Sequence, residues 1–584
     1  MPPRLRQYNN FTGIWSAIVY TGRSFGVRES VGIRACRSPA SLPGSAFYPN
    51  LKSEISKSRM IFRGPYPDVS IPEVSITDFI FQRTGEFKDK PALIDGPSGC
   101  TLTYGQFEDA VRRTAASLHK KGFRKGDVFG IFSTNCPEYG IAFHAVAMLG
   151  GISTLVNPLY TAEEAAFQLN NAEARFLVTS PQFVDKAREA AEQSKVEELF
   201  VFGQVENATP FDSLLQSDGN VPRVEINPRA DLVALPYSSG TTGLPKGVML
   251  THYNLVANMR QMDGLEYFTS DDTLLCVLPL FHIYGLVVVL NMGLHMGATI
   301  VMMPRFDLEQ FLGLIQKYRV TLSHIVPPIV LQLAQNPLID KYDLSSLKMV
   351  FSGAAPLSVD LSRQCMERVG CGIRQGYGMT ETSPVTHSSP PHPDDMKPGA
   401  VGPAAPNTEC KLVDPASGLE LGPNQEGELW VRGPQLMIGY LNNLEATART
   451  IDDEGWLHTG DIGYADEDGH FFIVDRMKEL IKYKGFQVAP AELEAVLLSH
   501  PAIADAAVIP CADAEAGEVP KAFVVLNGEA SAEEIMGFVA ERLAPHKKIR
   551  FVEFIEQIPK SASGKILRRV LVEKERAKAA SEKH

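Results

Sequence analysis

The segment Tyr237 to Thr251 reads YSSGTTGLPKGVMLT and has the composition of a loop that binds a polyphosphate. Glycines let backbone N–H groups turn toward an anion, serines and threonines add hydroxyl donors, and Lys246 supplies a positive charge. It is not a Walker A loop, because Gly247 follows the lysine where that motif needs Ser or Thr. The alternative interpretation is a polar surface loop, since short Gly/Ser/Thr stretches are also common linkers.

The elements that would position this loop follow a mixed α/β pattern from about Ile71 onward. Apolar runs such as Val128 to Phe132 are typical of buried strands, and Gln106 to Lys120 has a helical pattern. Similar runs recur at Ala174 to Thr179, Glu198 to Phe202, Thr273 to Leu278 and Leu347 to Phe351. The fold class predicted is α/β, with layered, doubly wound parallel sheets.

The chain has 584 residues, which is too long for one hydrophobic core, so at least two domains are expected. Its composition shifts after residues 427–433. The last hundred or so residues contain helical patterns at Pro490 to Ser499 and Ala532 to Leu543 and a strand at Ala504 to Ile509. We therefore predict a large domain over residues 60–475 and a small α+β domain over 476–584.

Composition excludes several classes of protein. A net charge of -12 argues against a general affinity for nucleic acid, and 44% hydrophobic with 21% charged residues is ordinary for a globular protein. The eight cysteines form no CxxC pair, which favours a reducing compartment. The longest apolar stretch, Phe281 to Val301, is interrupted by polar residues and glycines, so we expect buried strands and turns there and no membrane span.

The first 63 residues carry ten Lys/Arg against only Glu29 and Glu54. This is typical of a transit peptide, and a basic leader with no address is the alternative. Residues 1–59 are therefore predicted to be a leader, and Met60 would also serve as a start. A cytoplasmic or organellar location (mitochondrion or plastid) is expected rather than secretion.

Six motifs occur together: YSSGTTGLPKG (237–247), GYGMTE (376–381), GELWVRG (427–433), GWLHTGD (455–461), VDRMKELIKYKGFQVAPAELE (474–494) and PKSASGKILRR (559–569). In order and rough spacing they resemble the adenylate-forming acyl-CoA synthetase superfamily, and within it most closely the 4-coumarate:CoA ligases. The resemblance runs from about Ile61 to Arg569. It implies that a carboxylic acid attacks the α-phosphate of ATP to give an acyl adenylate, and that CoA then displaces AMP.

The resemblance also assigns the nucleotide site. It implies that the β- and γ-phosphates are held by Ser238, Ser239, Gly240, Thr241, Thr242 and Lys246. Thr380 would contact the α-phosphate, and Glu381 would ligate Mg²⁺, a hard cation that suits a carboxylate. Gln375, Gly376 and Tyr377 would frame the adenine, while Asp461 with Arg476 would bind the ribose hydroxyls.

Two groups of residues divide the half-reactions in this resemblance. Lys565 would polarise the carboxylate and α-phosphate during adenylation. The small domain would then rotate about a hinge at Arg476 to Lys478, which withdraws Lys565 and brings Lys482 and Gln487 to the adenylate. Lys484 and Gly485 would line the CoA tunnel, and Arg305 falls where a basic residue lies near the CoA phosphates.

The acyl pocket implied by the resemblance begins at His282, which would steer the carboxylate or gate the pocket. Its walls would be Tyr284, Gly353, Ala354, Gly378, Met379, Pro384 and Val385, a flat slot suited to 4-coumarate or a related cinnamate. Plant members carry a lysine where this chain has Phe351 and a serine near Val288, so a partner for the ring hydroxyl is missing. Cinnamate, a benzoate-like acid or a medium-chain fatty acid therefore remain alternatives.

Other functions on the same scaffold are a luciferase-like monooxygenase, an adenylating enzyme with an acceptor other than CoA, and a non-catalytic binding module. Nothing in the sequence marks oxygen chemistry, and a non-catalytic module would be expected to have lost Lys246, Glu381 or Lys565. We expect an acid–thiol ligase that uses ATP, Mg²⁺ and CoA, with small-molecule substrates, no nucleic-acid partner and a monomeric state.

Overall fold

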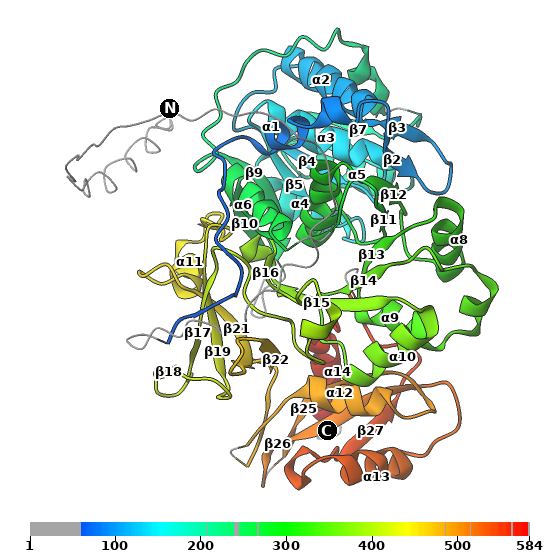
Figure 1. Cartoon of the computed structure of the whole chain (residues 1–584), viewed down its shortest axis with the longest axis vertical. Helices are drawn as coiled ribbons and strands as arrows, with labels where there is room; N and C mark the ends of the chain where they lie inside the picture. Colours follow the sequence, from blue (N-terminus) through cyan, green and yellow to red (C-terminus); the bar gives the residue numbers. More distant parts are fainter. Residues whose placement is uncertain are drawn as a thin grey trace, which may run out of the picture. The chain divides into compact units, whose positions relative to one another are not determined.

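The computed structural model describes residues 60–581, except residues 207, 239–244, 266–267, 485, 514 and 562–563 and the side chains of 579–581. Within these residues the strands form four sheets, with helices packed against them (Figure 1). Three of the sheets precede residue 477, and the fourth follows it.

The first sheet has the strand order β20-β10-β9-β5-β4-β6-β7-β8. Its strands are β4 (Val128–Phe132), β5 (Ile152–Leu155), β6 (Ala174–Thr179), β7 (Glu198–Val201), β8 (Thr209–Pro210), β9 (Leu232–Ser238), β10 (Lys246–Thr251) and β20 (Gly439–Tyr440). The strands from β9 to β8 are parallel, whereas β10 and β20 add an antiparallel edge. Every residue of β4 is buried, as expected of a parallel strand covered on both faces.

The second sheet has the order β16-β15-β14-β13-β11-β12-β2-β3. Its strands are β2 (Pro91–Asp95), β3 (Thr101–Thr103), β11 (Thr273–Cys276), β12 (Thr299–Met302), β13 (Leu322–Ile325), β14 (Met349–Ser352), β15 (Gly372–Gly378) and β16 (Val385–Ser388). Only the outer strands β3 and β16 are antiparallel to their neighbours. The carboxyl ends of β13, β14 and β15 therefore meet at one edge, where open α/β sheets bind ligands.

Ten helices, most of them connecting these strands, are α1 (Ile76–Phe81), α2 (Tyr104–Lys120), α3 (Pro137–Met148), α4 (Ala162–Asn171), α5 (Val184–Glu192), α6 (His252–Asp263), α7 (Met292–Met296), α8 (Leu308–Tyr318), α9 (Pro327–Gln335) and α10 (Val359–Val369). The predicted strand at 128–132 and the predicted helix ending at Lys120 are confirmed. Helix α2 begins at a capping box of Thr103 and Gln106, which satisfies backbone groups left open at the helix start.

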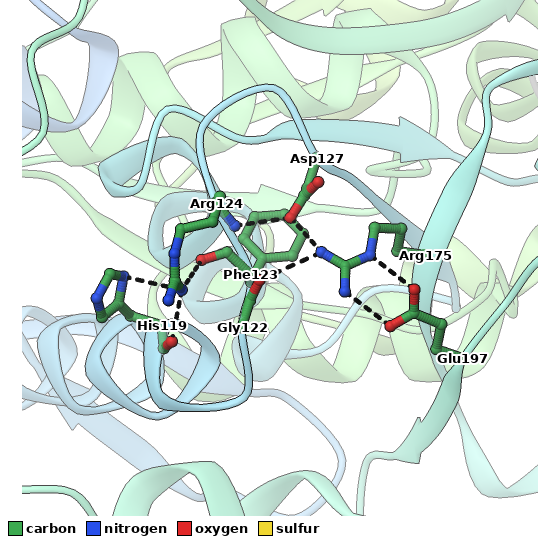
Figure 2. Close-up of polar contacts among 7 residues, drawn as sticks. All are labelled: His119, Gly122, Phe123, Arg124, Asp127, Arg175 and Glu197. Carbon is green, nitrogen blue, oxygen red and sulfur yellow. Dashed lines mark hydrogen bonds and ion pairs between the residues drawn. The ribbon is translucent and has the colours of Figure 1, made fainter. Parts of the chain in front are cut away.

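A polar network fastens the amino-terminal ends of β4, β6 and β7 (Figure 2). Arg175 at the start of β6 donates to both carboxylate oxygens of Glu197, at 2.9 and 2.7 Å, and also to Asp127, which precedes β4. Asp127 in turn accepts from the backbone N–H of Arg124, beyond the end of α2. A bidentate, shared arginine of this kind holds strand ends in register.

The prediction of buried strands and turns over Phe281 to Val301 is wrong for most of this stretch. It is mostly helical, with a π-helix over Tyr284–Asn291 that continues into α7, and only β12 at its end is a strand. Residues 285 to 291 of the π-helix are all buried, so no amphipathic period marks it as a helix, and its valines favoured a strand in the sequence. Among the described residues, no helix has both the length and the apolar character needed to cross a bilayer.

The third sheet has the order β1-β17-β19-β21-β22, with β18 beside β17. Its elements are β1 (Phe62–Arg63), β17 (Glu409–Val413), β18 (Glu420–Leu421), β19 (Gly427–Arg432), β21 (Leu457–Ala465) and β22 (Phe471–Arg476), with α11 (Leu444–Thr450) nearby in the chain. Its buried residues include Phe62, Leu412 and Phe471, which form a core of their own. Gly460 and Asp461 lie within β21 of this sheet.

The fourth sheet, drawn in orange to red in Figure 1, has the order β24-β23-β26-β25, with β27 beside β26. Its elements are β23 (Ile481–Tyr483), β24 (Phe486–Val488), β25 (Ile503–Asp513), β26 (Gly517–Leu526), β27 (Phe551–Phe554), α12 (Pro490–Leu498), α13 (Ala532–Arg542) and α14 (Arg568–Ser581). A separate core of Ile481, Leu493, Val508 and Ile535 holds it together. The predicted α/β class, with a large first part and a smaller α+β part, is confirmed.

Candidate functional site

The hairpin of β9 and β10 carries the candidate phosphate loop. Lys246 is the register partner of Ser238, so the two residues that bracket the loop lie directly opposite each other. Four residues predicted to bind phosphate lie between them in the chain and outside the described residues: Ser239, Gly240, Thr241 and Thr242. The Lys246 ammonium lies 4.9 Å from the centroid of the Tyr440 ring, which holds this cation at the mouth of the hairpin.

Glu381 lies beside this hairpin, in a short 3-10 turn that begins at Thr380. Its Oε1 accepts two hydrogen bonds, from Ser238 Oγ at 3.0 Å and from the Tyr440 hydroxyl at 2.8 Å. The side chain is only 6% exposed. The structure thus brings three predicted residues together, Ser238, Lys246 and Glu381, and adds Tyr440 to them.

Tyr440 is a site residue that the sequence analysis missed. It lies on β20, a two-residue strand that pairs with β10 at Val248. Burial and the negative charge of Glu381 raise the pKa of its hydroxyl far above the usual value, so Tyr440 remains a donor. Its GY dipeptide follows GELWVRG by a few residues, but nothing in that spacing indicates a contact with Glu381.

A second cluster joins Tyr377, Asp461 and Arg476. The Tyr377 hydroxyl donates to Asp461 Oδ2 at 2.6 Å, and Arg476 Nε lies 3.4 Å from Oδ1. Asp461 and Arg476 are register partners on β21 and β22, which explains why their side chains meet. Burial raises the pKa of Asp461, while Arg476 and the Tyr377 hydrogen bond oppose that shift. The two adenine predictions next to Tyr377, Gln375 and Gly376, are half-buried on β15.

Lys565 comes close to both clusters. Its pKa is lowered, first by burial and then by the charge of Arg476, while Asp461, Glu381 and Glu479 act to raise it. The side chain nevertheless remains accessible to solvent. A lysine surrounded by protein charges yet open to water is placed to meet a small anionic ligand.

The loop that carries Lys565 approaches the start of α9. Gly564 has φ +77°, and a Cβ at this position would lie 3.1 Å from Val326 Cγ2 and 3.5 Å from Pro328 Cγ. Glycine is therefore required here both for its backbone conformation and for close approach. Within the loop, the backbone N–H of Lys565 donates to Ser561 Oγ at 3.1 Å.

His282 precedes the π-helix and is half-buried. Burial, with a smaller contribution from Lys565, lowers the pKa of its imidazole to about 4, so the ring is neutral at physiological pH. Among the described residues its Nε2 is buried and has no hydrogen-bond partner. A neutral, unsatisfied imidazole near Lys565 suits a group that meets an incoming carboxylate.

The hairpin of β23 and β24 holds the residues predicted for the second half-reaction. Lys482 and Gln487 are register partners on it and both are exposed. Lys484 has φ +46° and forms an ion pair with Glu515, whereas Gly485 lies outside the described residues. The charges that act on Lys565 are those of Arg476, Asp461, Glu381 and Glu479.

The predicted acyl-pocket residues form two contacts. A Cβ on Gly353 would lie 3.1 Å from Tyr284 Cε1 and 3.4 Å from its hydroxyl oxygen, so the Tyr284 side chain packs closely against this glycine. A Cβ on Gly378 would lie 1.9 Å from the carbonyl oxygen of Pro384, so only glycine fits at this end of β15. The other residues predicted for the acyl pocket are their neighbours in the chain. Ala354 has φ +69°, and Val385 is 8% exposed. The N–H of Met379 donates to Pro384 O at 3.0 Å.

His324 is a second residue that the sequence analysis missed. Its Nδ1 lies 3.1 Å from the Tyr284 hydroxyl, and its ring stacks on Phe351 at 4.6 Å. Burial lowers the pKa of His324 to about 3, so it is neutral. It lies one strand from Phe351 in the parallel register of β13 and β14, a relation that the sequence alone does not contain.

Two of the residues predicted for the site lie at the surface. Arg305, after β12, and Lys478, in the segment after β22, are both exposed. Among the described residues, no group of His, Cys, Asp or Glu has the arrangement of a metal site made by protein ligands alone. A cation held partly by a nucleotide needs only one or two protein carboxylates, and Glu381 is such a group.

Comparisons with known proteins agree with this geometry. Residues 80–441 match the model for AMP-binding enzymes, and residues 492–565 match the model for the C-terminal domain of AMP-binding enzymes. The chain is 49% identical over 524 residues to 4-coumarate–CoA ligase 1 of Solanum tuberosum, covering 88% of this chain and 96% of the relative. It is 47% identical over 537 residues to 4-coumarate–CoA ligase 1 of Petroselinum crispum, covering 90% and 98%.

Solved structures show the same fold. An anthranilate CoA ligase in complex with anthranoyl-AMP matches with a TM-score of 0.81 at 27% identity, over 88% of this chain and 99% of that chain. A benzoate CoA ligase from Burkholderia xenovorans LB400 matches with a TM-score of 0.78 at 26% identity, over 85% and 99%.

Proposed function

We propose that this chain, which belongs to the AMP-binding enzyme family, uses 4-coumarate or a related cinnamate as its acid. It is an AMP-forming acid–thiol ligase, which activates an acid with ATP and joins it to CoA. The names of relatives with nearly half of their residues identical support this substrate class. The observation that carries it is the close contact of Tyr284 with Gly353, where a Cβ would come within 3.1 Å of the ring. Such a wall suits a planar acid.

In the proposed site the hairpin loop from Ser238 to Lys246 holds the β- and γ-phosphates, with donors from Ser239, Gly240, Thr241 and Thr242. Thr380 contacts the α-phosphate, and Glu381 holds Mg²⁺. The fit of Mg²⁺ is supported by the carboxylate itself, since the two hydrogen bonds that the described residues give to the Glu381 side chain both end on Oε1. Oε2 therefore remains for a cation, and when bound the cation neutralises charge on the phosphates.

The nucleoside is proposed to lie between β15 and β21. Gln375, Gly376 and Tyr377 frame the adenine, while Asp461 accepts hydrogen bonds from the ribose hydroxyls and Arg476 steadies the carboxylate. This role is supported by the burial of Asp461, which is 6% exposed, and by Arg476 and Tyr377, which oppose the rise in its pKa that burial causes.

In the proposed adenylation, the carboxylate of the acid attacks the α-phosphorus, a bond forms between them, and pyrophosphate leaves. Negative charge approaches negative charge, so the step requires cations that lie close in the transition state. Lys565 is proposed to neutralise the carboxylate and α-phosphate oxygens, and neutral His282 to orient the carboxylate. The position of Lys565 near Asp461 and Glu381 supports this assignment.

In the proposed second step, the CoA thiol, losing its proton, attacks the acyl carbon and AMP leaves. The small domain rotates about residues 476–478, so that Lys482 and Gln487 replace Lys565 beside the adenylate. Lys484 and Gly485 line the CoA tunnel, and Arg305 approaches the CoA phosphates. The exposure of Lys482 and Gln487 in the present arrangement supports a movement between the steps.

The far end of the acyl slot distinguishes the candidate acids. Phe351 is 4% exposed and Val288 is 1% exposed, and neither offers a hydrogen-bonding side chain to a ring hydroxyl. This favours cinnamate at least as much as 4-coumarate, and it supports a medium-chain fatty acid as the second candidate. The predicted wall residues Ala354, Gly378, Met379, Pro384 and Val385 complete the slot.

The remaining predictions stay part of the proposal. We propose domain limits at 60–475 and 476–584, a basic leader over residues 1–59 that is either a transit peptide or a leader with no address, and a monomer. The leader falls outside the described residues. A cytoplasmic or organellar location remains the expectation, based on the basic leader and the cysteine pattern.

The experiment that tests this proposal incubates the full chain with ATP, Mg²⁺, CoA and a panel of cinnamates, benzoates and medium-chain fatty acids, and follows AMP and thioester together. Thioester from the cinnamates is expected. AMP and thioester from aliphatic acids alone would overturn the substrate class, and pyrophosphate release without thioester would overturn CoA as the acceptor.

A further inference from the structure

Arg568, the first residue of α14, lies three positions after Lys565 and is the centre of a buried ion-pair network. Its Nη2 donates to Glu494 Oε2 at 2.7 Å, its Nη1 pairs with Glu479, and its Nε donates to Val508 O at 3.3 Å. The Arg568 side chain is 15% exposed and that of Glu494 is 9% exposed. A guanidinium with a planar fork can make these three contacts at once, whereas an ammonium cannot.

Glu494 completes the network from the side of α12. Its Oε1 accepts from the backbone N–H of Val508 at 2.8 Å, so Glu494 and Arg568 together bind both backbone groups of one residue of β25. Burial raises the pKa of Glu494 to about 7, and the charge of Arg568 opposes that shift. Arg568 therefore fixes α14 against both α12 and β25.

The network also reaches the segment where the small domain begins. Glu479 pairs with Arg568, and its charge also acts on Lys565 and Asp461. The negative charge of Asp475 also acts on Arg568 and favours its charged form. The Asp475 Oδ2 accepts a hydrogen bond from the N–H of Ala491 at 2.9 Å. The proposed hinge, 476–478, thus lies between two carboxylates that interact with Arg568.

The loop of Lys565 has one ion-pair anchor on each side. Before the loop, Lys560 pairs with Asp505 of β25 at 2.6 Å, and after it stands Arg568. Between them, the loop is closed by its own backbone, with Ser561 N donating to Lys565 O at 2.8 Å. The side chain of Lys565 is long, so its placement depends on where this short turn is held.

We propose that Arg568 is a positioning residue for adenylation: it fixes the turn that carries Lys565 to Glu479, so that the turn and the hinge segment move as one unit. This inference rests on the proposed role of Lys565. The β23–β24 hairpin, with Lys482 and Gln487, pairs with β26, whereas the contacts of Arg568 among the described residues are with Glu479, Glu494 and Val508. Loss of Arg568 should therefore impair adenylation far more than transfer to CoA.

The test compares four variants of the full chain: Arg568→Gln, Arg568→Lys, Glu479→Gln and Arg569→Gln. Arg569 is the matched control, because it is 72% exposed and its one ion pair within the described residues is with Glu573 on its own helix. Adenylation is measured by ATP–pyrophosphate exchange with the acid found active in the panel. Transfer is measured from the corresponding synthetic acyl adenylate to CoA, and Tm is recorded for each variant.

A misplaced catalytic group costs on the order of 100-fold in rate, so Arg568→Gln is expected to lose about 100-fold in exchange while transfer changes little. Arg568→Lys is expected to recover part of the loss. Arg569→Gln is expected to keep the exchange rate of the unaltered chain. If Arg568→Gln does not fold, Glu479→Gln tests the inference in its place. Glu479 is 25% exposed, and replacing it leaves the contact between Arg568 and Glu494 intact. Glu479→Gln is expected to lower exchange more than transfer.

Equal losses in both half-reactions, or unchanged exchange in Arg568→Gln and Glu479→Gln, would overturn the inference. Failure of the proposed function is distinguishable from this result. In that case the unaltered chain and Arg569→Gln would themselves form no adenylate with any acid in the panel.

Discussion

The Tyr440 hydroxyl donates a hydrogen bond of 2.8 Å to Oε1 of Glu381, the same oxygen that accepts from Ser238. Both donors bind the same oxygen of the carboxylate, and in the part of the chain that the structure describes Oε2 is left for another ligand. Tyr440 also presents its ring to the Lys246 ammonium at 4.9 Å. One tyrosine therefore joins the phosphate hairpin to the carboxylate proposed to hold the metal.

The first prediction follows from this contact. Tyr440→Phe keeps the ring under Lys246 but removes the donor, and a lost hydrogen bond to a charged group is worth about 1.5 to 3 kcal/mol. We expect ATP to bind at least 10-fold more weakly at limiting Mg²⁺, measured by titration calorimetry over a range of Mg²⁺ concentrations. Tyr464→Phe is the matched control, since Tyr464 stacks on Phe472 at 4.8 Å and keeps that contact as phenylalanine. Equal ATP affinity in Tyr440→Phe and the unaltered chain would contradict the role of Tyr440.

The second prediction concerns Gly564. Its φ of +77° and the 3.1 Å approach of a Cβ to Val326 mean that Gly564→Ala strains the turn and pushes it from α9. The left-handed conformation alone costs about 1 to 2 kcal/mol for a residue with a Cβ, so adenylation should fall about 10-fold. Gly537→Ala is the control, because a Cβ there meets nothing within 4 Å. ATP–pyrophosphate exchange measures both, and equal rates in the two variants would exclude a need for close approach at Gly564.

The third prediction concerns the acid. Because neither Phe351 nor Val288, proposed for the far end of the slot, has a hydrogen-bonding side chain, kcat/KM for cinnamate should equal or exceed that for 4-coumarate. Val288→Ser places a hydroxyl at this end and should shift the ratio toward 4-coumarate by several-fold, since a paired hydroxyl contributes about 1 kcal/mol. Competition of the two acids in one assay gives the ratio directly. A strong preference of the unaltered chain for 4-coumarate would show that another residue meets the ring hydroxyl.

The fourth prediction is a loss of stability in acid. Burial lowers the pKa of six histidines to about 3 or 4: His144, His252, His282, His295, His324 and His387. Their ordinary pKa is about 6.5, so below that pH the unfolded chain binds protons that the folded chain does not. The stabilisation is complete above pH 6.5 and is lost as the pH falls toward 4.

Urea denaturation at pH 7.5, 6 and 5 should therefore give a falling free energy of unfolding. His252→Asn supplies the matched variant, because His252 Nδ1 accepts from the N–H of Ile76 at 3.2 Å and an asparagine oxygen can accept in its place. Its pH dependence should be shallower by about one proton. Glu494, whose pKa is raised to about 7, contributes in the opposite sense, with stability lost as the pH rises through that value. A free energy of unfolding that does not change between pH 7.5 and 5 would contradict this account.

Much of the architecture can be predicted from local patterns. The apolar run 128–132 and the helical patterns ending near Lys120, Ser499 and Leu543 correspond to β4, α2, α12 and α13. The π-helix at 284–291 was not predictable, because a helix buried on every side loses its apolar period. The motifs identified the family and the class of reaction.

Residues that act through contacts across the fold were missed. Tyr440 meets Glu381 because β20 pairs with β10, and His324 meets Phe351 because β13 and β14 share a register. Arg568 lies inside a predicted motif, yet its partners Glu479 and Glu494 come from other segments. Such relations depend on tertiary pairing, which neither composition nor spacing contains.

The measurement that tests the account most directly is made on Lys565→Ala. ATP–pyrophosphate exchange should be nearly abolished, while transfer of the acyl group from a supplied adenylate to CoA should be retained, because the charges of Arg476, Asp461 and Glu381 act on Lys565. Equal loss of both half-reactions, or full exchange activity, would contradict the division of the two steps between Lys565 and the β23–β24 hairpin.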